Sequence, residues 1–428
     1  MDRVILHSDM NHCYAAIELL HHPELRGKPV AVGGDPEARH GIILAKDPLA
    51  KKAGVKTGMA LWEAREACPD LAVLPPHMDL YLRFSRIAHE IYAEYTDQWE
   101  PFGIDECWLD VTASAGCRGD GEAIAREINA RIKSELGITV SVGVSWNKIF
   151  AKLGSDYRKP DAVTAVSREN YREIAWPLPA GDLLYVGRAT RRKLQKYGIS
   201  TIGELARTDP AFLEQRFGKM GLVLSCFARG EDRTPVRRED ASAPVKSIGN
   251  STTAPRDLVC MEDVKIVIYV LAESVAARLR EAHFKCRTVE ISVRDRDLYS
   301  FTRQRKLEMP TDLTSEIAEA AFGLFREQYG WQKPVRSIGV RACRLTDADT
   351  PVQLNLFFDE ERREKEHRMD LAADSIRARF GYGSLQRGLM YQDRVLAALD
   401  AKEEHTVHPR GYFEDGNRTG AEEMKDAG

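Results

Sequence analysis

The chain has 428 residues, of which 43% are hydrophobic and 30% charged, and its formal net charge is −3. A chain of this length folds as more than one domain, and its small net charge means that any nucleic-acid-binding surface must be local. The eight cysteines form no CxxC pair and no His/Cys cluster with zinc spacing, which excludes such zinc sites and favours a reducing compartment. The N-terminus shows no signal peptide and no apolar run is long enough to span a bilayer. We therefore expect a cytoplasmic protein without a membrane partner.

Residues 4–7 are predicted to form a buried strand, which is followed by Asp9 and then by a helical pattern that contains Tyr14. An Asp between a buried strand and a helix N-terminus is well placed to hold a cation, while the free N–H groups of the helix hold an anion. The alternative is that Asp9 only caps the helix.

Asp105 and Glu106 are adjacent carboxylates between apolar runs. In a regular strand they would point to opposite faces, but at the bend of a hairpin both can lean toward one point. Two such carboxylates repel each other unless a hard cation such as Mg²⁺ lies between them. The alternative is an acidic surface turn. Together with Asp9 they supply three carboxylates on two β elements, the arrangement that two-metal phosphoryl transfer requires.

The rest of the chain changes along its length in the secondary structure that it predicts. Apolar periodicity predicts helices over 83–95 and 121–136 and a strand over 138–144, as in an α+β layer. Short helices and Gly turns follow from about residue 167, and 183–193 resembles a helix–hairpin–helix. Residues 245–345 predict strands with two helices, and there Lys and Arg outnumber Asp and Glu. Near the C-terminus we expect a short helix over 370–381 and a disordered end.

These stretches resemble the Y-family DNA polymerases of the DinB (DNA polymerase IV) type. The resemblance is carried by ILHSDMNHCYAAIE and LRGKPVAVGG near the N-terminus, GIDECWLDVT around the carboxylate pair and SVGVSWNKIFAKLGSDYRKP at 141–160. It runs collinearly from residue 4 to about 358.

The resemblance implies an α+β multidomain fold, a right-hand-like polymerase. Its expected parts are a palm (1–10 and 77–166), small fingers (11–76), a helix–hairpin–helix thumb (167–235), a linker (236–244), an α+β little finger (245–346), a clamp-binding-like segment (347–358) and a C-terminal extension (359–428).

The activity that the resemblance implies is template-directed, low-fidelity translesion DNA synthesis, in which dNMP is added to a primer 3′-OH by two-metal catalysis. Asp9, Asp105 and Glu106 match the catalytic metal-binding carboxylates, and the Met10 backbone oxygen adds a ligand. The expected cofactor is two Mg²⁺ ions, for which Mn²⁺ can substitute. Tyr14 falls at the steric-gate position, where an aromatic ring occupies the space that a ribose 2′-OH would need.

The resemblance also implies contacts to the incoming nucleotide, from His12, Cys13, Lys51 and Lys159. Here the chain departs from the family. Asn11 stands in place of a common second Asp, and Cys13 in place of an aromatic. Pro48 and Lys51 stand where most relatives have Tyr and Arg, so the triphosphate would be held by a point charge without Arg's forked geometry. Lys46 is a candidate to compensate.

The expected partners are primer–template DNA, dNTPs and the β-subunit sliding clamp, and we expect a monomer. The expected DNA-binding residues are Lys148, Lys152, Gly187, Arg294, Arg296, Arg303 and Arg305. The alternative for the charged members is a solvated helix or strand face. The segment 353–357 resembles the bacterial clamp-binding motif through Gln353, Leu354, Leu356 and Phe357, against the alternative of an edge strand.

Two other functions remain open. One is a two-metal phosphodiesterase or cyclase on a similar palm, although such an enzyme needs no grip on primer and template. The other is a catalytically attenuated, clamp-tethered DNA-binding accessory protein, which Asn11, Cys13 and Pro48 favour. The presence of all three carboxylates argues against a loss of catalysis.

Overall fold

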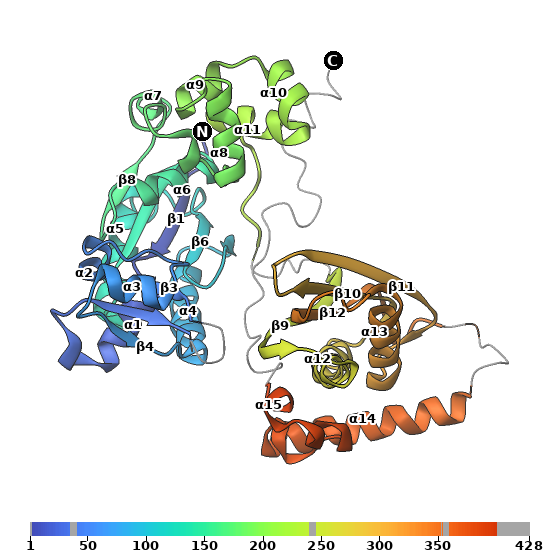
Figure 1. Ribbon diagram of the computed structural model, residues 1–428. Coiled ribbons are helices and arrows are strands. Elements are labelled where there is room, and N and C mark those ends of the chain that lie inside the picture. The colour runs from blue at the N-terminus through green and yellow to red at the C-terminus, as the bar shows by residue number, and fades with distance from the viewer. Residues whose placement is uncertain (1, 35–40, 239–244, 352, 354–358, 400–428) are drawn as a thin grey trace. The chain divides into compact units, whose positions relative to one another are not determined.

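The computed structural model describes residues 2–34, 41–238, 245–351, 353 and 359–399 (Figure 1). The chain divides into two compact units, the first including residues 2–34 and 42–238 and the second the described residues between 245 and 399. The predicted mixture of helices and sheets is confirmed, and all eight cysteines are free thiols. Within the described ranges, no helix is both long enough and apolar enough to cross a membrane.

The first unit is built on a five-stranded sheet in the order β5-β6-β1-β7-β8. Its strands are β1 (Ile5–Met10), β5 (Trp99–Pro101), β6 (Glu106–Asp110), β7 (Val140–Ser145) and β8 (Val163–Ala165). The central strand β1 is buried along its whole length and pairs antiparallel with both β6 and β7. A central buried strand has a fixed register, so the side chains that it carries are held in one place.

Helices cover both faces of this sheet. On one face Leu6 and Leu109 join the core formed with α4 (Met78–Ala93) and α5 (Gly121–Arg131), which continues as one π-helical segment, Ile132–Leu136. On the other face Ile5 and Trp108 pack with α6 (Lys148–Tyr157). Side chains alternate along a strand, so Ile5, His7 and Asp9 all face α6.

A smaller three-stranded sheet, in the order β3-β2-β4, has a core of its own. It consists of β2 (Val30–Gly33), β3 (Ile43–Lys46) and β4 (Ala72–Leu74), and its neighbours along the chain are α1 (Cys13–His21), the 3-10 turn Pro23–Leu25, α2 (Pro48–Lys52) and α3 (Leu61–Ala67). Asp47 caps α2 by accepting a hydrogen bond from the Ala50 N–H at 2.8 Å, and Pro48 occupies the first helical turn, where proline's missing N–H costs nothing.

Short helices complete the first unit. They are α7 (Tyr171–Ile174), the 3-10 turn Ala180–Asp182, α8 (Arg188–Lys196), α9 (Ile202–Arg207), α10 (Pro210–Phe217) and α11 (Lys219–Arg229). Beyond them, Val236 is buried and the Arg237 N–H donates to Glu100 at 3.0 Å. The expected linker over 236–244 is therefore wrong at its start, because these residues pack against the first unit.

The second unit contains a four-stranded antiparallel sheet in the order β11-β10-β12-β9. The strands are β9 (Ser247–Leu258), β10 (Phe284–Asp295), β11 (Ser300–Thr311) and β12 (Val335–Asp347). The two helices predicted here, α12 (Met261–Glu281) and α13 (Thr314–Gln328), cover one face of the sheet (Figure 1). Their apolar stripes form the core with Val289, Ile291 and Val293.

The C-terminal extension of the second unit begins with α14 (Glu360–Phe380), which is longer than the helix expected over 370–381. Its first half is highly charged and carries no apolar stripe, so periodicity could not reveal it. This half docks through polar contacts instead, since Ser315 Oγ donates to Glu366 at 2.6 Å and His367 Nε2 lies 3.2 Å from Asp312. The 3-10 turns Tyr382–Ser384 and Gly388–Gln392 and α15 (Arg394–Ala397) follow.

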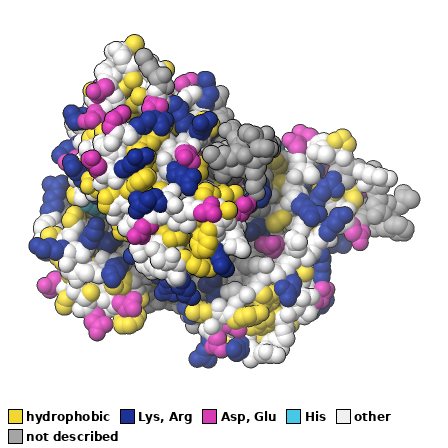
Figure 2. All heavy atoms as spheres, turned by 90° about the horizontal axis from the view of Figure 1, so that it is seen from above, with side chains coloured by type: hydrophobic (Ala, Val, Ile, Leu, Met, Phe, Trp, Pro, Cys, Tyr) yellow, Lys and Arg dark blue, Asp and Glu magenta, His cyan; other side chains and the backbone are white. Residues whose placement is uncertain are grey.

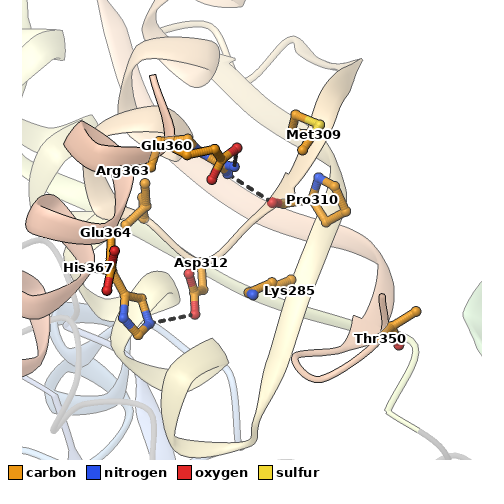
Figure 3. A pocket seen from close by; sticks show the side chains of 10 residues that line it. Lys285, Met309, Pro310, Asp312, Thr350, Glu360, Arg363, Glu364 and His367 are labelled. Carbon is orange, nitrogen blue, oxygen red and sulfur yellow. Dashed lines mark hydrogen bonds and ion pairs between the residues drawn. The ribbon is translucent and has the colours of Figure 1, made fainter. Parts of the chain in front are cut away.

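A pocket of about 350 Å³ lies between α14 and the sheet (Figure 3). Glu360, Arg363, Glu364 and His367 line it from α14, and Arg363 donates to the Pro310 carbonyl oxygen at 3.0 Å. The three carboxylates singled out in the sequence lie in the first unit, so this pocket is not the predicted metal site.

Candidate active site

Strand register brings two of the three predicted carboxylates together. In the antiparallel pair of β1 and β6, Asp9 lies directly opposite Glu106. Residues opposite each other in such a pair project to the same face of the sheet. The predicted hairpin is confirmed: β5 and β6 are antiparallel, and the Phe102 N–H donates to the Glu106 carbonyl oxygen at 2.8 Å.

Asp105 lies at the end of the hairpin loop, immediately before β6. Its carbonyl oxygen accepts a hydrogen bond from the Met10 N–H at 2.9 Å. This bond ties the loop to the end of β1, so Asp9, Met10 and Asp105 are held next to one another by the backbone. The chain thus places all four predicted metal-binding positions at one end of the sheet.

The sequence reasoning missed His7. Its Nε2 lies 3.3 Å from Glu106 Oε2, and its Nδ1 lies 2.8 Å from Ser155 Oγ. Among the described residues, His7, Asp9 and Glu106 each offer a ligand atom within 4.8 Å of the other two. The signal was present in the sequence, because His7 is two residues before Asp9 and must share its face of the strand.

Two lysines of the 141–160 block neutralise the carboxylates. Lys159 Nζ lies 2.6 Å from Asp9 Oδ2 and 2.7 Å from Asp156 Oδ1, and Lys152 is ion-paired with Glu106. The alternative of a solvated helix face does not hold for Lys152, because α6 turns this side chain toward the carboxylates. Lys159, expected at the triphosphate, lies in the site and is 31% exposed.

Burial and charge shift the titration of these groups in different directions. Burial raises the pKa of Asp9 even though Lys159 acts against it, and burial with the neighbouring Glu106 charge raises the pKa of Asp105. Burial also acts to raise the pKa of Glu106, but His7 and Lys152 outweigh it and hold that pKa at about 2. Burial and Lys152 lower the pKa of His7 to about 4, so its ring is neutral at pH 7.

This donor set fits a divalent cation. Buried carboxylates that repel one another are stabilised by a hard cation, and oxygen atoms are the ligands that Mg²⁺ and Mn²⁺ accept. In the structure, the ammonium groups of Lys152 and Lys159 neutralise the carboxylates of Glu106 and Asp9 by pairing with their oxygen atoms.

Lys148 does not reach the surface. Its side chain is completely buried, its Nζ lies 2.7 Å from Glu100 Oε2, and it lies over the Trp108 ring at 4.4 Å from the ring centroid. The prediction that Lys148 contacts DNA is therefore wrong. A buried ammonium group requires a partner charge, and here that charge comes from β5.

Tyr14 lies at the start of α1, half-buried. Its ring stacks on that of Tyr81 from α4, with centroids 4.3 Å apart and planes 8° from parallel. Burial and the nearby Asp105 charge raise the pKa of Tyr14 to about 12, so its hydroxyl stays protonated. The aromatic ring is thus held at the edge of the carboxylate cluster.

A group of basic residues surrounds His12, which is the left-handed N-cap of α1 with φ 44°. Burial lowers the pKa of His12, and the charges of Asp47, Lys51, Lys159 and Lys46 all act on it. Burial and Lys51 likewise lower the pKa of Lys46. The fold therefore brings Lys159 close to Lys46 and Lys51, which are near each other in the chain, and this is a suitable environment for an anion.

Cys13 differs from the expectation that it contacts the nucleotide. Its side chain is 4% exposed, and its Sγ lies 3.8 Å from Met10 Sδ in the core. The thiol is turned away from the surface, so a nucleotide contact at this position would come from the backbone.

Gly187 is the N-cap of α8 and has no neighbouring atom within 4 Å of an added Cβ. No acidic side chain lies in the first turn of α8, where the free N–H groups of a helix attract anions. The helix begins where the helix–hairpin–helix pattern placed it.

Arg294, Arg303 and Arg305 lie on the antiparallel pair of β10 and β11, but their side chains project from different faces of the sheet. Arg294 lies opposite Ser300, whereas Arg303 and Arg305 lie opposite the core residues Ile291 and Val289. Arg303 and Arg305 therefore share the helix-covered side, where Arg303 donates to Gln328 at 3.2 Å and Arg305 pairs with Glu327 at 2.5 Å. Arg294 projects from the open face of the sheet.

Sequence reasoning missed Arg341, which pairs across strands with Glu290 and shares the open face with Arg294 and Lys306. Arg296 follows β10, and its Nε lies 4.0 Å from Asp257.

Of the clamp-binding-like residues, Leu354, Leu356 and Phe357 lie outside the described residues. On the face shown in Figure 2, Lys and Arg side chains are interspersed with Asp and Glu, in agreement with the small net charge.

Comparison with known proteins identifies the relatives of this chain. Residues 8–156 match the impB/mucB/samB family, and residues 245–356 match the C-terminal domain of that family. The chain is 52% identical over 396 residues to DNA polymerase IV of Acetivibrio thermocellus, which covers 92% of this chain and 99% of that protein. It is 35% identical over 399 residues to DNA polymerase IV of Clostridium acetobutylicum, and this match covers 92% of this chain and 99% of that protein.

The fold is similar to that of a solved Y-family DNA polymerase chimera. The TM-score is 0.69 at 23% sequence identity, and the match covers 80% of this chain and 99% of the chimera. At this identity the likeness concerns the fold.

Proposed function

Because this chain belongs to the impB/mucB/samB family, we propose that it is a template-directed DNA polymerase of the DNA polymerase IV type, which extends a primer 3′-OH across damaged templates. The observation that carries this function is the convergence of Asp9, Asp105 and Glu106 at one end of the central sheet. The relatives span nearly the whole chain, which favours the polymerase over the accessory protein and over the phosphodiesterase or cyclase.

The cofactor is two Mg²⁺ ions, which Mn²⁺ can replace, held by the Asp9, Asp105 and Glu106 carboxylates and the Met10 carbonyl oxygen. When bound, such ions lower the pKa of the primer hydroxyl and stabilise the charge on the reacting phosphate. His7 and Lys152 hold the pKa of Glu106 below its usual range, which favours the ionised form that binds a cation. His7, hydrogen-bonded to Ser155, places its Nε2 3.3 Å from Glu106 Oε2 on the buried side, without a hydrogen bond between the two.

The incoming nucleotide would lie between the carboxylates and α1. Lys159 is exposed enough to reach a triphosphate, and Lys51 and Lys46 supply further positive charge near His12. The Tyr14 ring would occupy the position of a ribose 2′-OH, so the site would select deoxynucleotides.

The DNA backbone would be held by surfaces that read no sequence. In the first unit this is the N-terminus of α8 at Gly187. In the second unit it is the open face of the sheet with Arg294, Lys306 and Arg341. Arg296, next to this sheet, remains a candidate contact to the DNA backbone. Arg303 and Arg305 would contact DNA only at the edge of the sheet, on strand β11.

The domain names follow the same proposal. The five-stranded sheet is the palm, the three-stranded sheet with α1 the fingers, the short helices the thumb and the second unit the little finger. The 353–357 segment remains a proposed contact with the sliding clamp, and a monomer working in the cytoplasm is the proposed state.

Primer extension on an undamaged template with Mg²⁺ and four dNTPs tests the function. Wild type should extend the primer and Glu106→Gln should not, although the two side chains have nearly the same shape. Glu122→Gln is the matched control, because Glu122 lies in the same unit in an exposed pair with Arg126. A wild-type protein that binds primer–template without extending it would instead favour the accessory protein.

A further inference from the structure

A buried carboxylate lies behind the proposed steric gate and has no part in the chemistry described so far. Glu18 of α1 is 1% exposed. Its Oε1 accepts a hydrogen bond from the Tyr81 hydroxyl, and His77 Nδ1 lies 2.9 Å from the same oxygen. A carboxylate is buried at a high cost unless donors satisfy it, so this pairing of α1 with the start of α4 is specific.

Tyr81 connects this carboxylate to the gate. Its side chain is completely buried, and its hydroxyl end is held by Glu18 while its ring face lies against Tyr14 at 4.3 Å between centroids. Burial and the Glu18 carboxylate raise the pKa of the Tyr81 phenol, so it remains a donor. Tyr14 and Glu18 are four residues apart on α1 and therefore share one face of the helix, which Tyr81 spans.

We propose that Glu18 is a positioning residue for sugar selection, which acts through Tyr81 on the ring of Tyr14. The inference rests on the proposed function of Tyr14. A ring can exclude a 2′-OH only if it stays in place when a ribonucleotide enters the site. Stacking on Tyr81 blocks the space into which Tyr14 would move, and Glu18 keeps Tyr81 from rotating or sliding out of the stack.

The measurement is the ratio of kcat/KM for a dNTP to that for the matching rNTP on one primer–template. Glu18→Ala should lower this ratio about tenfold, the equivalent of one lost hydrogen bond to a charged group. The change should come from a higher kcat/KM for the rNTP, with dNTP insertion nearly constant. Glu18→Gln should restore most of the ratio, because its amide oxygen still accepts from Tyr81.

Tyr81→Phe provides a second variant that keeps the stacked ring and removes only the hydroxyl, so it decides the matter if Glu18→Ala fails to fold. It should also lower the ratio. Tyr95→Phe is the matched control, since the Tyr95 hydroxyl donates to Glu127 at 2.8 Å in the same unit without touching Tyr14. It removes a similar bond and should leave the ratio unchanged.

Tyr14→Ala separates this inference from the function on which it rests. If Tyr14→Ala lowers the ratio while Glu18→Ala and Tyr81→Phe leave it at the wild-type value, the assignment of Tyr14 as the steric gate is supported and the positioning role of Glu18 is refuted. If Tyr14→Ala itself leaves the ratio unchanged, the gate assignment fails and the role of Glu18 fails with it.

Discussion

His7 Nε2 lies 3.3 Å from Glu106 Oε2, beneath the cluster of carboxylates at the end of the central sheet. The ring is completely buried and is held from its other side by Ser155 at 2.8 Å. Glu106 therefore lies against a neutral ring on its buried side and is ion-paired with Lys152. This relationship leads to the first of five predictions.

His7→Phe keeps a buried ring but removes the nitrogen that faces Glu106. We expect a lower kcat for primer extension and a higher Mg²⁺ concentration for half-maximal activity, because the variant removes one of the three ligand atoms that lie within 4.8 Å of one another, and with it a polar group that orients the site. A Mg²⁺ titration of the extension rate measures both. His21→Phe, which changes a histidine bonded to the Ile17 carbonyl oxygen at 3.0 Å, is the control. An unaltered Mg²⁺ requirement in His7→Phe would rule out the orienting role.

Gly143→Ala should destabilise the first unit strongly. Strand β7 and helix α6 approach so closely here that an added Cβ would lie 1.8 Å from the Ala151 carbonyl oxygen and 2.5 Å from the Ser155 nitrogen. Neither backbone atom can move without separating the helix from the sheet, so we expect a loss of about 3 kcal/mol or more in the free energy of unfolding. Urea denaturation measures it, and Gly330→Ala, with no atom within 4 Å, should be nearly neutral.

His89 should make the protein less stable in mild acid. Burial lowers its pKa from the ordinary 6.5 to about 4 in the folded state. Between these two values the unfolded chain binds the proton and the folded chain does not, so stability falls as the pH decreases from about 6.5 to about 4. His89→Phe, which keeps a ring against Trp99, should reduce this fall. Urea unfolding at pH 7 and pH 5 tests it, and equal pH dependence in both proteins would contradict it.

Asp370→Ala should loosen the C-terminal extension from the second unit. The carboxylate is 6% exposed, accepts from the Thr314 N–H at 2.9 Å and lies 3.3 Å from guanidinium nitrogens of both Arg280 and Arg387. Its loss leaves the buried Thr314 N–H without its acceptor and removes one of the carboxylates that pair with Arg280 and Arg387, for which we expect about 2 kcal/mol of destabilisation. Thermal unfolding and limited proteolysis after α13 would reveal it. Glu361→Gln, at an exposed position of the same helix, should behave as wild type.

Arg294→Ala and Arg303→Ala should differ in their effect on DNA affinity. Arg294 projects from the open face of the second sheet, whereas Arg303 lies on the helix-covered side and donates to Gln328. We expect Arg294→Ala to weaken primer–template binding and to reduce the salt dependence by about one released counterion. Arg303→Ala should have a much smaller effect. Salt titrations of binding decide it, and equal losses would show that the open face is not the one that holds DNA.

The placement of the three carboxylates could be predicted because local patterns determine where they lie. Asp9 follows a buried strand and the Asp105–Glu106 pair interrupts a hairpin, so alternation and turn geometry suffice to bring them to one end of a sheet. The long apolar stripes of α12 and α13 were visible for the same reason. His7 obeys the same alternation and lies on the same face of β1 as Asp9.

The lysines show what local pattern could not decide. Lys148 and Lys152 are four residues apart on one helix and look like a solvated face, yet one is buried against Glu100 and the other pairs with Glu106. The charges that receive them come from strands far away in the sequence. A charged side chain is buried only where tertiary packing supplies an opposite charge, and no property of the helix itself reveals that partner.

The sequence by itself determined the strand and helix pattern, the position of the three carboxylates and the family, because each depends on residues close together in the chain. Only the tertiary structure decided which cations reach the carboxylates, which arginines share the open face of the second sheet, and that Tyr81 and Glu18 stand behind Tyr14. These relationships depend on the register between strands and on the packing of α1 against α4. Both are set by the burial of the whole core rather than by any one segment.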